Sequence, residues 1–231
     1  MNTIATLIMG LAAAVLVTAL LGFAVIPWLR KLHFGQTILD IGPKWHEKKQ
    51  GTPTMGGIMF ILGTIAAFAV TVVTDKLVGG NIVASSATGA PAAELYTKFY
   101  SGIIFALGVA LIGFADDYIK VVKKRNLGLT AIQKLALQLA AAGAYLALLR
   151  WNGDLTCDLY IPFWNVSFEI NWIVYLIFAM FVIVGCVNAV NLTDGIDGLA
   201  SGVTLPVMVF FAVTAWMWGK TTLALLPAAL A

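Results

Sequence analysis

The stretch IATLIMGLAAAVLVTALLGFAVIPWL, from Ile4 to Leu29, decides the fold class. It carries no charged side chain, and roughly 20 apolar residues are enough to cross the hydrocarbon core of a bilayer. A cleaved signal peptide would have a basic n-region and a shorter apolar run of about 7–15 residues. We therefore interpret Ile4–Leu29 as a retained membrane-spanning helix.

The composition of the whole chain also indicates an integral membrane protein. Of its 231 residues, 61% are hydrophobic and 11% are charged, and the mean hydropathy is +0.94. A soluble domain has about 45–50% apolar and about 25% charged residues, so this chain lacks the polar groups that a water-facing surface needs. The 14 basic and 11 acidic residues leave a net charge of +3, too small an excess to indicate nucleic-acid binding.

Further charge-poor stretches follow the first one along the chain. They predict spans at Gly57–Thr74, Phe99–Ala115, Leu135–Leu149, Trp172–Val190 and Val203–Trp218, and the start of a seventh at Leu223–Ala231. Between the fourth and fifth spans, Thr156–Ile161 and Val166–Ile170 alternate apolar and polar residues around Pro162–Asn165, which predicts a hairpin. The predicted fold is an all-α integral membrane protein with about six complete spans and a small outer-side β-hairpin, forming one domain over residues 1–231.

The basic residues predict the orientation of the spans. Ten lie in two loops on one side: Arg30, Lys31, Lys44, Lys48, Lys49, Lys120, Lys123, Lys124, Arg125 and Lys134. Four lie on the other side: Lys76, Lys98, Arg150 and Lys220. Because cytoplasmic loops carry the excess of lysine and arginine, we expect the amino terminus to lie outside and the first, third and fifth loops to face the cytoplasm.

The first polar stretch on that cytoplasmic side is Lys44–Gly57, which leads into the second span. Lys48 adds positive charge that suits a phosphorylated ligand, and Thr52 offers a hydroxyl group. The glycine pair at its end lets a ligand or another backbone approach closely. An ordinary basic loop that ends in a helix start explains the same residues, and composition alone favours that plainer interpretation.

The second polar stretch contains the adjacent carboxylates Asp116 and Asp117, at the predicted end of the third span. Their repulsion would be relieved by a divalent cation, a lysine partner or a bound proton. Lys120 lies one turn further on, so on a continuing helix it could reach one of them. Paired carboxylates near phosphate are typical of Mg²⁺ sites and of proton acceptors, although a solvated helix end is an equally good interpretation.

The third polar stretch, Asn188–Leu199, follows the fifth span. Amides and carboxylates recur there at every third residue: Asn188, Asn191, Asp194 and Asp197. Gly195 and Gly198 lower the helix propensity, which predicts a bend or turn with exposed backbone donors. Polar groups at the end of an apolar span are costly and usually functional, and these could hold a nucleoside or a metal.

Together the three stretches resemble the phospho-N-acetylmuramoyl-pentapeptide transferases, bacterial membrane enzymes that begin the lipid stage of peptidoglycan synthesis. The resemblance runs along essentially the whole chain and rests on Lys48–Gly57, Asp116–Lys120, Leu129–Lys134 with Gln138, and Asn188–Leu199. It implies transfer of phospho-MurNAc-pentapeptide from its UDP carrier to undecaprenyl phosphate, giving lipid I and UMP. It also implies Mg²⁺ as cofactor, a homodimer, and a place in the bacterial inner (plasma) membrane with the active site on the cytoplasmic face.

The resemblance gives the polar residues their expected roles. Asp116 is expected to deprotonate the lipid phosphate, with Asp117 beside it. The expected catalytic residues, which are also the expected metal ligands, are Asp116, Asp117 and Asp194. The expected substrate-binding residues are Lys48, Thr52, Lys120, Lys134, Asn188, Asn191 and Asp197.

The chain departs from the family pattern at its C-terminal end. Family members continue through further spans into a Gly-Asp-x-Gly-Ser loop, whose Asp is a metal ligand, and a histidine-rich segment. Neither appears in the sequence. We therefore expect a fragment that lacks the C-terminal third of the family pattern, with an incomplete Mg²⁺ site and no transferase activity of its own.

Three other functions compete with this hypothesis. A related polyprenyl-phosphate GlcNAc-1-phosphate transferase is disfavoured by Thr52–Gly57, because relatives that use GlcNAc tend to have arginine near that position. A transporter would place ionisable groups near the bilayer midplane, whereas the acidic residues here lie in predicted loops or at span ends. A non-catalytic scaffold gives no reason for adjacent aspartates beside basic loops.

Overall fold

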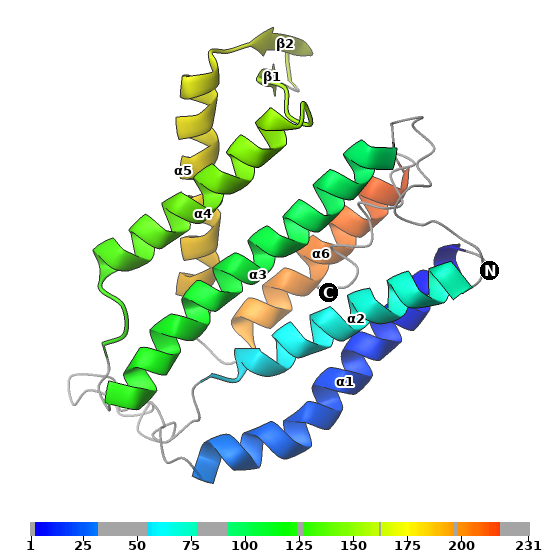
Figure 1. Ribbon diagram of the computed structural model, residues 1–231, viewed down its shortest axis with the longest axis vertical. Helices are drawn as coiled ribbons and strands as arrows, with labels where there is room; N and C mark the ends of the chain where they lie inside the picture. The colour runs from blue at the N-terminus through cyan, green and yellow to red at the C-terminus, as the bar shows by residue number, and fades with distance from the viewer. Residues whose placement is uncertain are drawn as a thin grey trace. The chain divides into compact units, whose positions relative to one another are not determined.

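The computed structural model describes residues 3–31, 55–77, 92–123, 127–161, 163–195 and 198–217. In chain order, its elements are α1 (Thr3–Lys31), α2 (Gly57–Leu77), α3 (Ala92–Lys123), α4 (Ala131–Trp151), β1 (Asp158–Ile161), β2 (Val166–Glu169), α5 (Trp172–Thr193) and α6 (Leu199–Met217) (Figure 1). The described part of the chain is therefore helical apart from one pair of short strands.

Five of the described helices contain segments long and apolar enough to cross a membrane: Ile8–Lys31, Gly57–Leu77, Tyr96–Lys123, Ala131–Trp151 and Trp172–Thr193. α6 contains an apolar segment, Leu199–Ala215, that covers most of the predicted sixth span, whose last residue, Trp218, lies outside the described residues. The predicted start of a seventh span, Leu223–Ala231, lies outside the described residues. The all-α membrane fold is confirmed, and the chain is a multi-pass membrane protein.

The described residues form two compact units. The first contains α1, α2, α3 from Ala110 onwards, and the chain up to Lys134 at the start of α4. The second contains α3 up to Val109, α4 from Leu135 onwards, the hairpin, α5 and α6. A single membrane domain over residues 1–231 stays a prediction.

In the first unit, α1 and α2 pack side by side through small residues (Figure 1). Gly10 lies against Thr71, and Gly63 lies against Thr18, so closely that a Cβ atom at either glycine would clash with the threonine hydroxyl. Ala67, between Gly63 and Thr71 on α2, is fully buried. Helices in a bilayer commonly associate through small residues, because lipid tails are as apolar as the side chains and no hydrophobic force draws the helices together.

Replacing Gly63 with leucine is expected to destabilise the chain by about 1–3 kcal/mol, because overpacking must displace Thr18 and the main-chain oxygen of Ala14. Unfolding in mixed micelles by added dodecyl sulfate measures the loss. Gly57→Leu on the same helix is the matched control, since nothing lies within 4 Å of a Cβ atom at that position. Equal stability of the two variants would contradict the packing described for α1 and α2.

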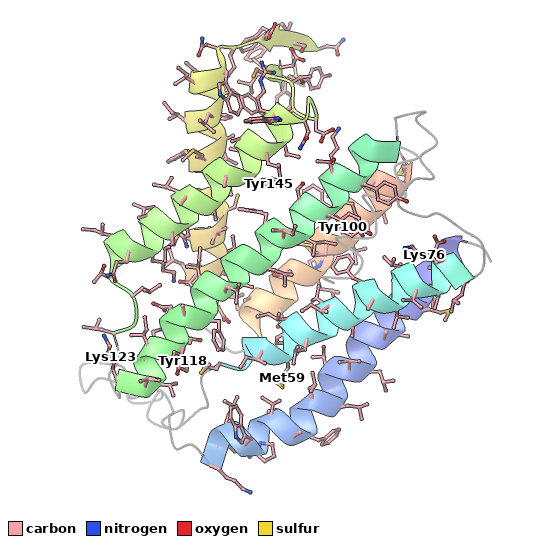
Figure 2. The ribbon with its side chains drawn as sticks, viewed as in Figure 1. Met59, Lys76, Tyr100, Tyr118, Lys123 and Tyr145 are labelled. Carbon is pink, nitrogen blue, oxygen red and sulfur yellow. The ribbon has the colours of Figure 1, made fainter. Side chains whose placement is uncertain are left out.

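In the second unit, one face of α4 is buried against its neighbours. The buried residues are Gln138, Ala142, Leu146 and Leu149, whose spacing of three and four is that of a single helix face. Phe105 of α3 stacks on Tyr145 of α4, with ring centroids 4.7 Å apart. Figure 2 labels Tyr145 on α4. Met180 of α5 lies in van der Waals range of a Cβ atom placed at Gly143. α4 is thus the helix that contacts both α3 and α5 here.

The hairpin between α4 and α5 confirms the prediction from alternating residues. β1 and β2 pair antiparallel, from Asp158 opposite Glu169 to Ile161 opposite Val166. The Ile170 N–H donates to the Cys157 carbonyl at 3.0 Å and continues the pairing beyond the strands. The turn places Asn165 at φ 51°, in the left-handed region that asparagine tolerates, and its side chain accepts a hydrogen bond from the Tyr160 hydroxyl at 2.9 Å.

α5 and α6 are joined by the turn that the third polar stretch predicts. α5 begins at an N-cap, where the Asn171 side chain accepts a hydrogen bond from the Ile173 N–H at 2.8 Å. It ends at Thr193 with Asp194 as its C-cap. Gly198 has φ 80°, a conformation that favours glycine, and α6 starts at the next residue. The bend at the glycines is confirmed.

Candidate functional site

Asp116 and Asp117 lie inside α3 and not after its end. The predicted span stopped at Ala115, but the helix continues to Lys123. Carboxylates near a helix C-terminus oppose the helix dipole, whereas Lys120 and Lys123 in the last turn complement it and offset that cost. The continuation fixes both carboxylates on helical backbone, one turn before the lysines.

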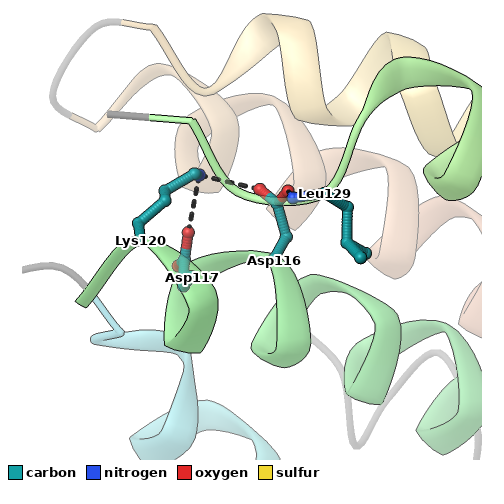
Figure 3. A network of polar contacts seen from close by, with 4 residues as sticks. All are labelled: Asp116, Asp117, Lys120 and Leu129. Carbon is teal, nitrogen blue, oxygen red and sulfur yellow. Dashed lines mark hydrogen bonds and ion pairs between the residues drawn. The ribbon is translucent and has the colours of Figure 1, made fainter. Parts of the chain in front are cut away.

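Lys120 binds both carboxylates at once (Figure 3). Its Nζ lies 2.7 Å from Asp116 Oδ2 and 2.9 Å from Asp117 Oδ1. The sequence predicted that Lys120 could reach one of the two carboxylates. It reaches both, because the residues three and four positions before it lie side by side on a helix. Lys120 is thus the lysine partner that was predicted as one way to relieve the repulsion between the two carboxylates. Asp116 is the more shielded carboxylate, with 13% of its side chain exposed against 37% for Asp117.

The other oxygen of Asp116 is held by the backbone of the segment before α4. Asp116 Oδ1 accepts a hydrogen bond from the Leu129 N–H at 2.8 Å (Figure 3). The approach depends on Gly128, because a Cβ atom there would overlap the main-chain and carboxylate oxygens of Asp116. With Oδ2 bound to Lys120 and Oδ1 bound to Leu129, the orientation of the carboxylate is fixed.

The same segment starts α4 with a capping box. The Gln133 N–H donates to the Thr130 hydroxyl at 3.2 Å, and the Thr130 N–H donates to Gln133 Oε1 at 3.0 Å. α4 therefore begins at Ala131, before the predicted start at Leu135. Lys134, on its first turn, is close enough to Asp116 to stabilise the negative charge there. Two negative and two positive side chains thus gather at this end of α3.

Asn188, a predicted substrate-binding residue, is paired with Gln138 in the second unit. Asn188 Nδ2 donates to Gln138 Oε1 at 2.7 Å and to the Val184 carbonyl at 2.9 Å, and Gln138 Nε2 returns a longer contact of 3.5 Å to Asn188 Oδ1. Gln138 is buried, with 3% of its surface exposed. An amide pair of this kind joins α4 to α5, as polar side chains commonly do between helices in a bilayer.

A double-mutant cycle of Gln138→Leu and Asn188→Leu is expected to give a coupling energy of about 0.6 kcal/mol, the mean for such pairs in a membrane protein, and at most about 1.7 kcal/mol. Each single change leaves a polar amide without its partner, so the double variant should be more stable than the sum of the two losses predicts. Unfolding in mixed micelles measures all four proteins. Strictly additive losses would show that the pair does not join the helices.

The remaining residues of the third stretch lie where α5 ends. Asn191 is on the last turns of α5, and the exposed Asp194 donates its backbone N–H to the Val190 carbonyl at 3.2 Å. Lys48, Thr52 and Asp197 lie outside the described residues. Within either unit, no three acidic, histidine or cysteine side chains of the described ranges gather as metal ligands. Asp116 and Asp117 remain the adjacent pair of carboxylates that could contribute to a metal site.

Three features of this site were not predicted from the sequence. The contact of Gly128 with Asp116 and the Leu129 N–H bond join residues that lie far apart along the chain, and no local pattern reports such a contact. The third, the capping box, was available as Thr130-x-x-Gln133 directly before an apolar run. That pattern identifies the true start of α4.

Comparison with known proteins gives matches along most of the chain. Residues 99–231 match the family model of glycosyl transferase family 4. Residues 49–61 match signature 1 of the phospho-N-acetylmuramoyl-pentapeptide-transferases. The first match includes Asp116, Asp117 and Lys120, and the second includes Thr52.

Several curated bacterial proteins named phospho-N-acetylmuramoyl-pentapeptide-transferase are similar in sequence. The one from Bacillus subtilis (strain 168) is 43% identical over 211 residues, which cover 91% of this chain and 58% of the relative. The one from Geobacillus kaustophilus is 41% identical over 214 residues, covering 93% and 60%. The one from Bacillus pumilus is 40% identical over 226 residues, covering 98% and 63%.

These matches identify the family of the chain and show how much of its relatives' length the chain spans. The chain spans between 58% and 63% of the length of these three relatives. The family model covers more than half of the chain and includes the carboxylate pair on α3. The chain belongs to glycosyl transferase family 4 and carries within it the phospho-N-acetylmuramoyl-pentapeptide-transferase signature.

Proposed function

We propose that this chain forms part of an enzyme that transfers phospho-MurNAc-pentapeptide from UDP-MurNAc-pentapeptide to undecaprenyl phosphate. The products are lipid I and UMP, and the process served is peptidoglycan synthesis. The observation that carries the proposal is the oriented carboxylate of Asp116, held by Lys120 and the Leu129 N–H on a membrane-spanning helix. The names of the curated relatives support the choice of sugar donor.

The reaction needs an oxygen nucleophile and stabilised phosphate charge. An oxygen of the lipid phosphate attacks the β-phosphorus of the UDP-sugar, the new P–O bond makes a pyrophosphate, and the bond to the α-phosphate oxygen breaks to release UMP. Catalysis of phosphoryl transfer consists mostly of positioning and charge stabilisation. The carboxylates at the end of α3 can accept the proton of the nucleophile, and the lysines there can stabilise the phosphate charge.

In this proposal Asp116 accepts the proton of the lipid phosphate through Oδ2. Its Oδ1 is already held by the Leu129 N–H, which leaves Oδ2 as the oxygen whose partner can change. Lys120, bound to Oδ2 and to Asp117, would turn towards the incoming phosphate, because a phosphate dianion is the stronger acceptor. Lys134 would add positive charge on the same side.

We further propose Mg²⁺ as the cofactor. Mg²⁺ binds protein through one or two carboxylates and takes its other ligands from water and substrate phosphates, so the donor set of Asp116 and Asp117 suits it. Asp194 is proposed as a further ligand. When bound, the ion would neutralise negative charge on the transferring phosphates.

The donor nucleotide is proposed to bind the remaining polar residues. These are Lys48, Thr52, Asn188, Asn191 and Asp197. We propose that they face the cytoplasm of a bacterium from its inner membrane, because ten of the basic residues lie in the loops on that side. A homodimer is proposed from the family resemblance, and cross-linking in native membranes tests it.

The proposed function is tested in a protein of the relatives' full length that carries this sequence. Purified protein is given undecaprenyl phosphate, Mg²⁺ and either UDP-MurNAc-pentapeptide or UDP-GlcNAc, and release of UMP is followed. Lipid I formation from the first donor is expected. Transfer from UDP-GlcNAc alone would replace the proposed substrate with the related one, and no transfer from either would refute the proposal.

A further inference from the structure

The hairpin between α4 and α5 has one polar and one apolar face. Residues directly opposite in an antiparallel pair share a face, and the faces alternate along each strand. The register therefore places on one face Asp158, Glu169, Tyr160 and Ser167. It places on the other face Leu159, Phe168, Ile161 and Val166. The two acidic residues lie opposite each other, and like charges in that position need water around them.

The turn of the hairpin and the β2 half of its apolar face are exposed, whereas Leu159 and Ile161 of β1 are half-buried. Phe168 is 44% and Val166 is 48% exposed. At the turn, Phe163 is 95% and Trp164 is 75% exposed. A two-stranded ribbon is at best marginally stable alone in water, and the described residues leave Phe163, Trp164 and Phe168 exposed. Some other phase or molecule must cover this face.

The position of the hairpin in the chain places it at a membrane boundary. It connects α4, which ends at Trp151, to α5, which begins at Trp172, and both helices qualify as spans. Arg150 lies over the Trp172 ring with its Cζ atom 5.7 Å from the centroid, and Trp151 is 90% exposed. Tryptophan and snorkelling arginine mark the headgroup level of a bilayer. The strands run across these helix ends and do not extend the helix axes (Figure 1).

We propose that the hairpin lies flat in the bilayer interface, with Phe163, Trp164 and Phe168 inserted among the lipids of the leaflet at the α4–α5 end. The face with Asp158 and Glu169 then remains in water, as its charges require. Lipid suits this face better than a second copy of the chain. Two four-residue strands are too small to bury the roughly 800 Å² per partner of an ordinary protein interface.

The lipid partner is expected to be zwitterionic. Asp158 and Glu169 sit at the base of the ribbon and would repel an anionic headgroup. Insertion of the aromatic side chains holds the ends of α4 and α5 at one depth, because each aromatic ring prefers the headgroup level over both water and hydrocarbon. The hairpin is thus a lipid-binding element between the C-terminal end of α4 and the N-terminal end of α5.

The experiment reconstitutes the full chain in phosphatidylcholine nanodiscs and follows tryptophan fluorescence. The chain has seven tryptophans, so the contribution of Trp164 is taken as the difference between the chain and a Trp164→Phe variant. Lipids brominated near the top of the acyl chain are expected to quench this contribution about twofold, and iodide in the water should change it little.

A probe on the other face of the ribbon gives the matched control. Ser167→Trp in the Trp164→Phe background should be quenched by iodide and little by the brominated lipid. Quenching of Trp164 by iodide alone would show that the hairpin stands in water, and protection from both quenchers would show that protein covers it. Either result overturns the proposal, as does equal lipid quenching of the two probes.

Discussion

Asp116→Asn is expected to lower the turnover of lipid I synthesis by about 10²- to 10⁴-fold, the range for loss of a positioned proton acceptor. Asparagine has the same shape and keeps a carbonyl oxygen for the Leu129 N–H, so the local structure should remain. It cannot take a proton, and its amide cannot form the ion pair with Lys120. The measurement is UMP release by the full-length protein at saturating substrates.

The control for this change is Tyr118→Phe on the same helix. Tyr118 is 52% exposed and stacks on Phe114, so the loss of its hydroxyl leaves the carboxylates untouched. Its turnover should stay near that of the parent protein. Turnover near the parent value in Asp116→Asn would remove Asp116 from the mechanism.

Gly128→Ala is expected to reduce turnover by about 10- to 100-fold, which corresponds to loss of one hydrogen bond to a charged group. A Cβ atom at residue 128 would overlap both the main-chain oxygen and the carboxylate of Asp116. The backbone of this segment must therefore move away, and the Leu129 N–H moves with it. Because the change leaves every reacting group in place, the kcat should fall more than the KM rises.

The matched control is Gly113→Ala on α3, where nothing lies within 4 Å of an added Cβ atom. Alanine there should be neutral or stabilise the helix by about 0.5–1 kcal/mol. Comparison of the two glycine variants separates a steric effect at Asp116 from a general effect of alanine. Normal kcat in Gly128→Ala would show that the Leu129 hydrogen bond does not orient Asp116 for the reaction.

The sequence predicted the features that depend on neighbouring residues. Charge-free runs of sufficient length located the membrane spans. Alternation of apolar and polar residues located the hairpin of β1 and β2, because hydrophobic periodicity is a local property of the sequence. The glycines at the end of α5 correctly indicated a turn. Helix ends were less well located: the predicted third span ends at Ala115, whereas α3 continues to Lys123, and Lys120 and Lys123 stabilise its last turns.

Contacts between distant residues could not be predicted in the same way. The amide group of Asn188 pairs with Gln138 fifty positions away, and polarity alone does not reveal this contact. The fit of Gly10 against Thr71 and of Gly63 against Thr18 depends on which helix lies beside α1. The small residues at four-residue spacing on both helices were visible, but the pairing needed the structure.

The segment 127–130 ties the orientation of a membrane helix to the carboxylate of Asp116. The Leu129 N–H holds Asp116, and the next residue, Thr130, caps α4. Helices adjust their tilt when the bilayer is thinner or thicker than their apolar length. A change in the tilt of α4 would pull directly on that one hydrogen bond. The thickness of the bilayer would then affect the orientation of the Asp116 carboxylate, and lipids of different chain length would change that orientation.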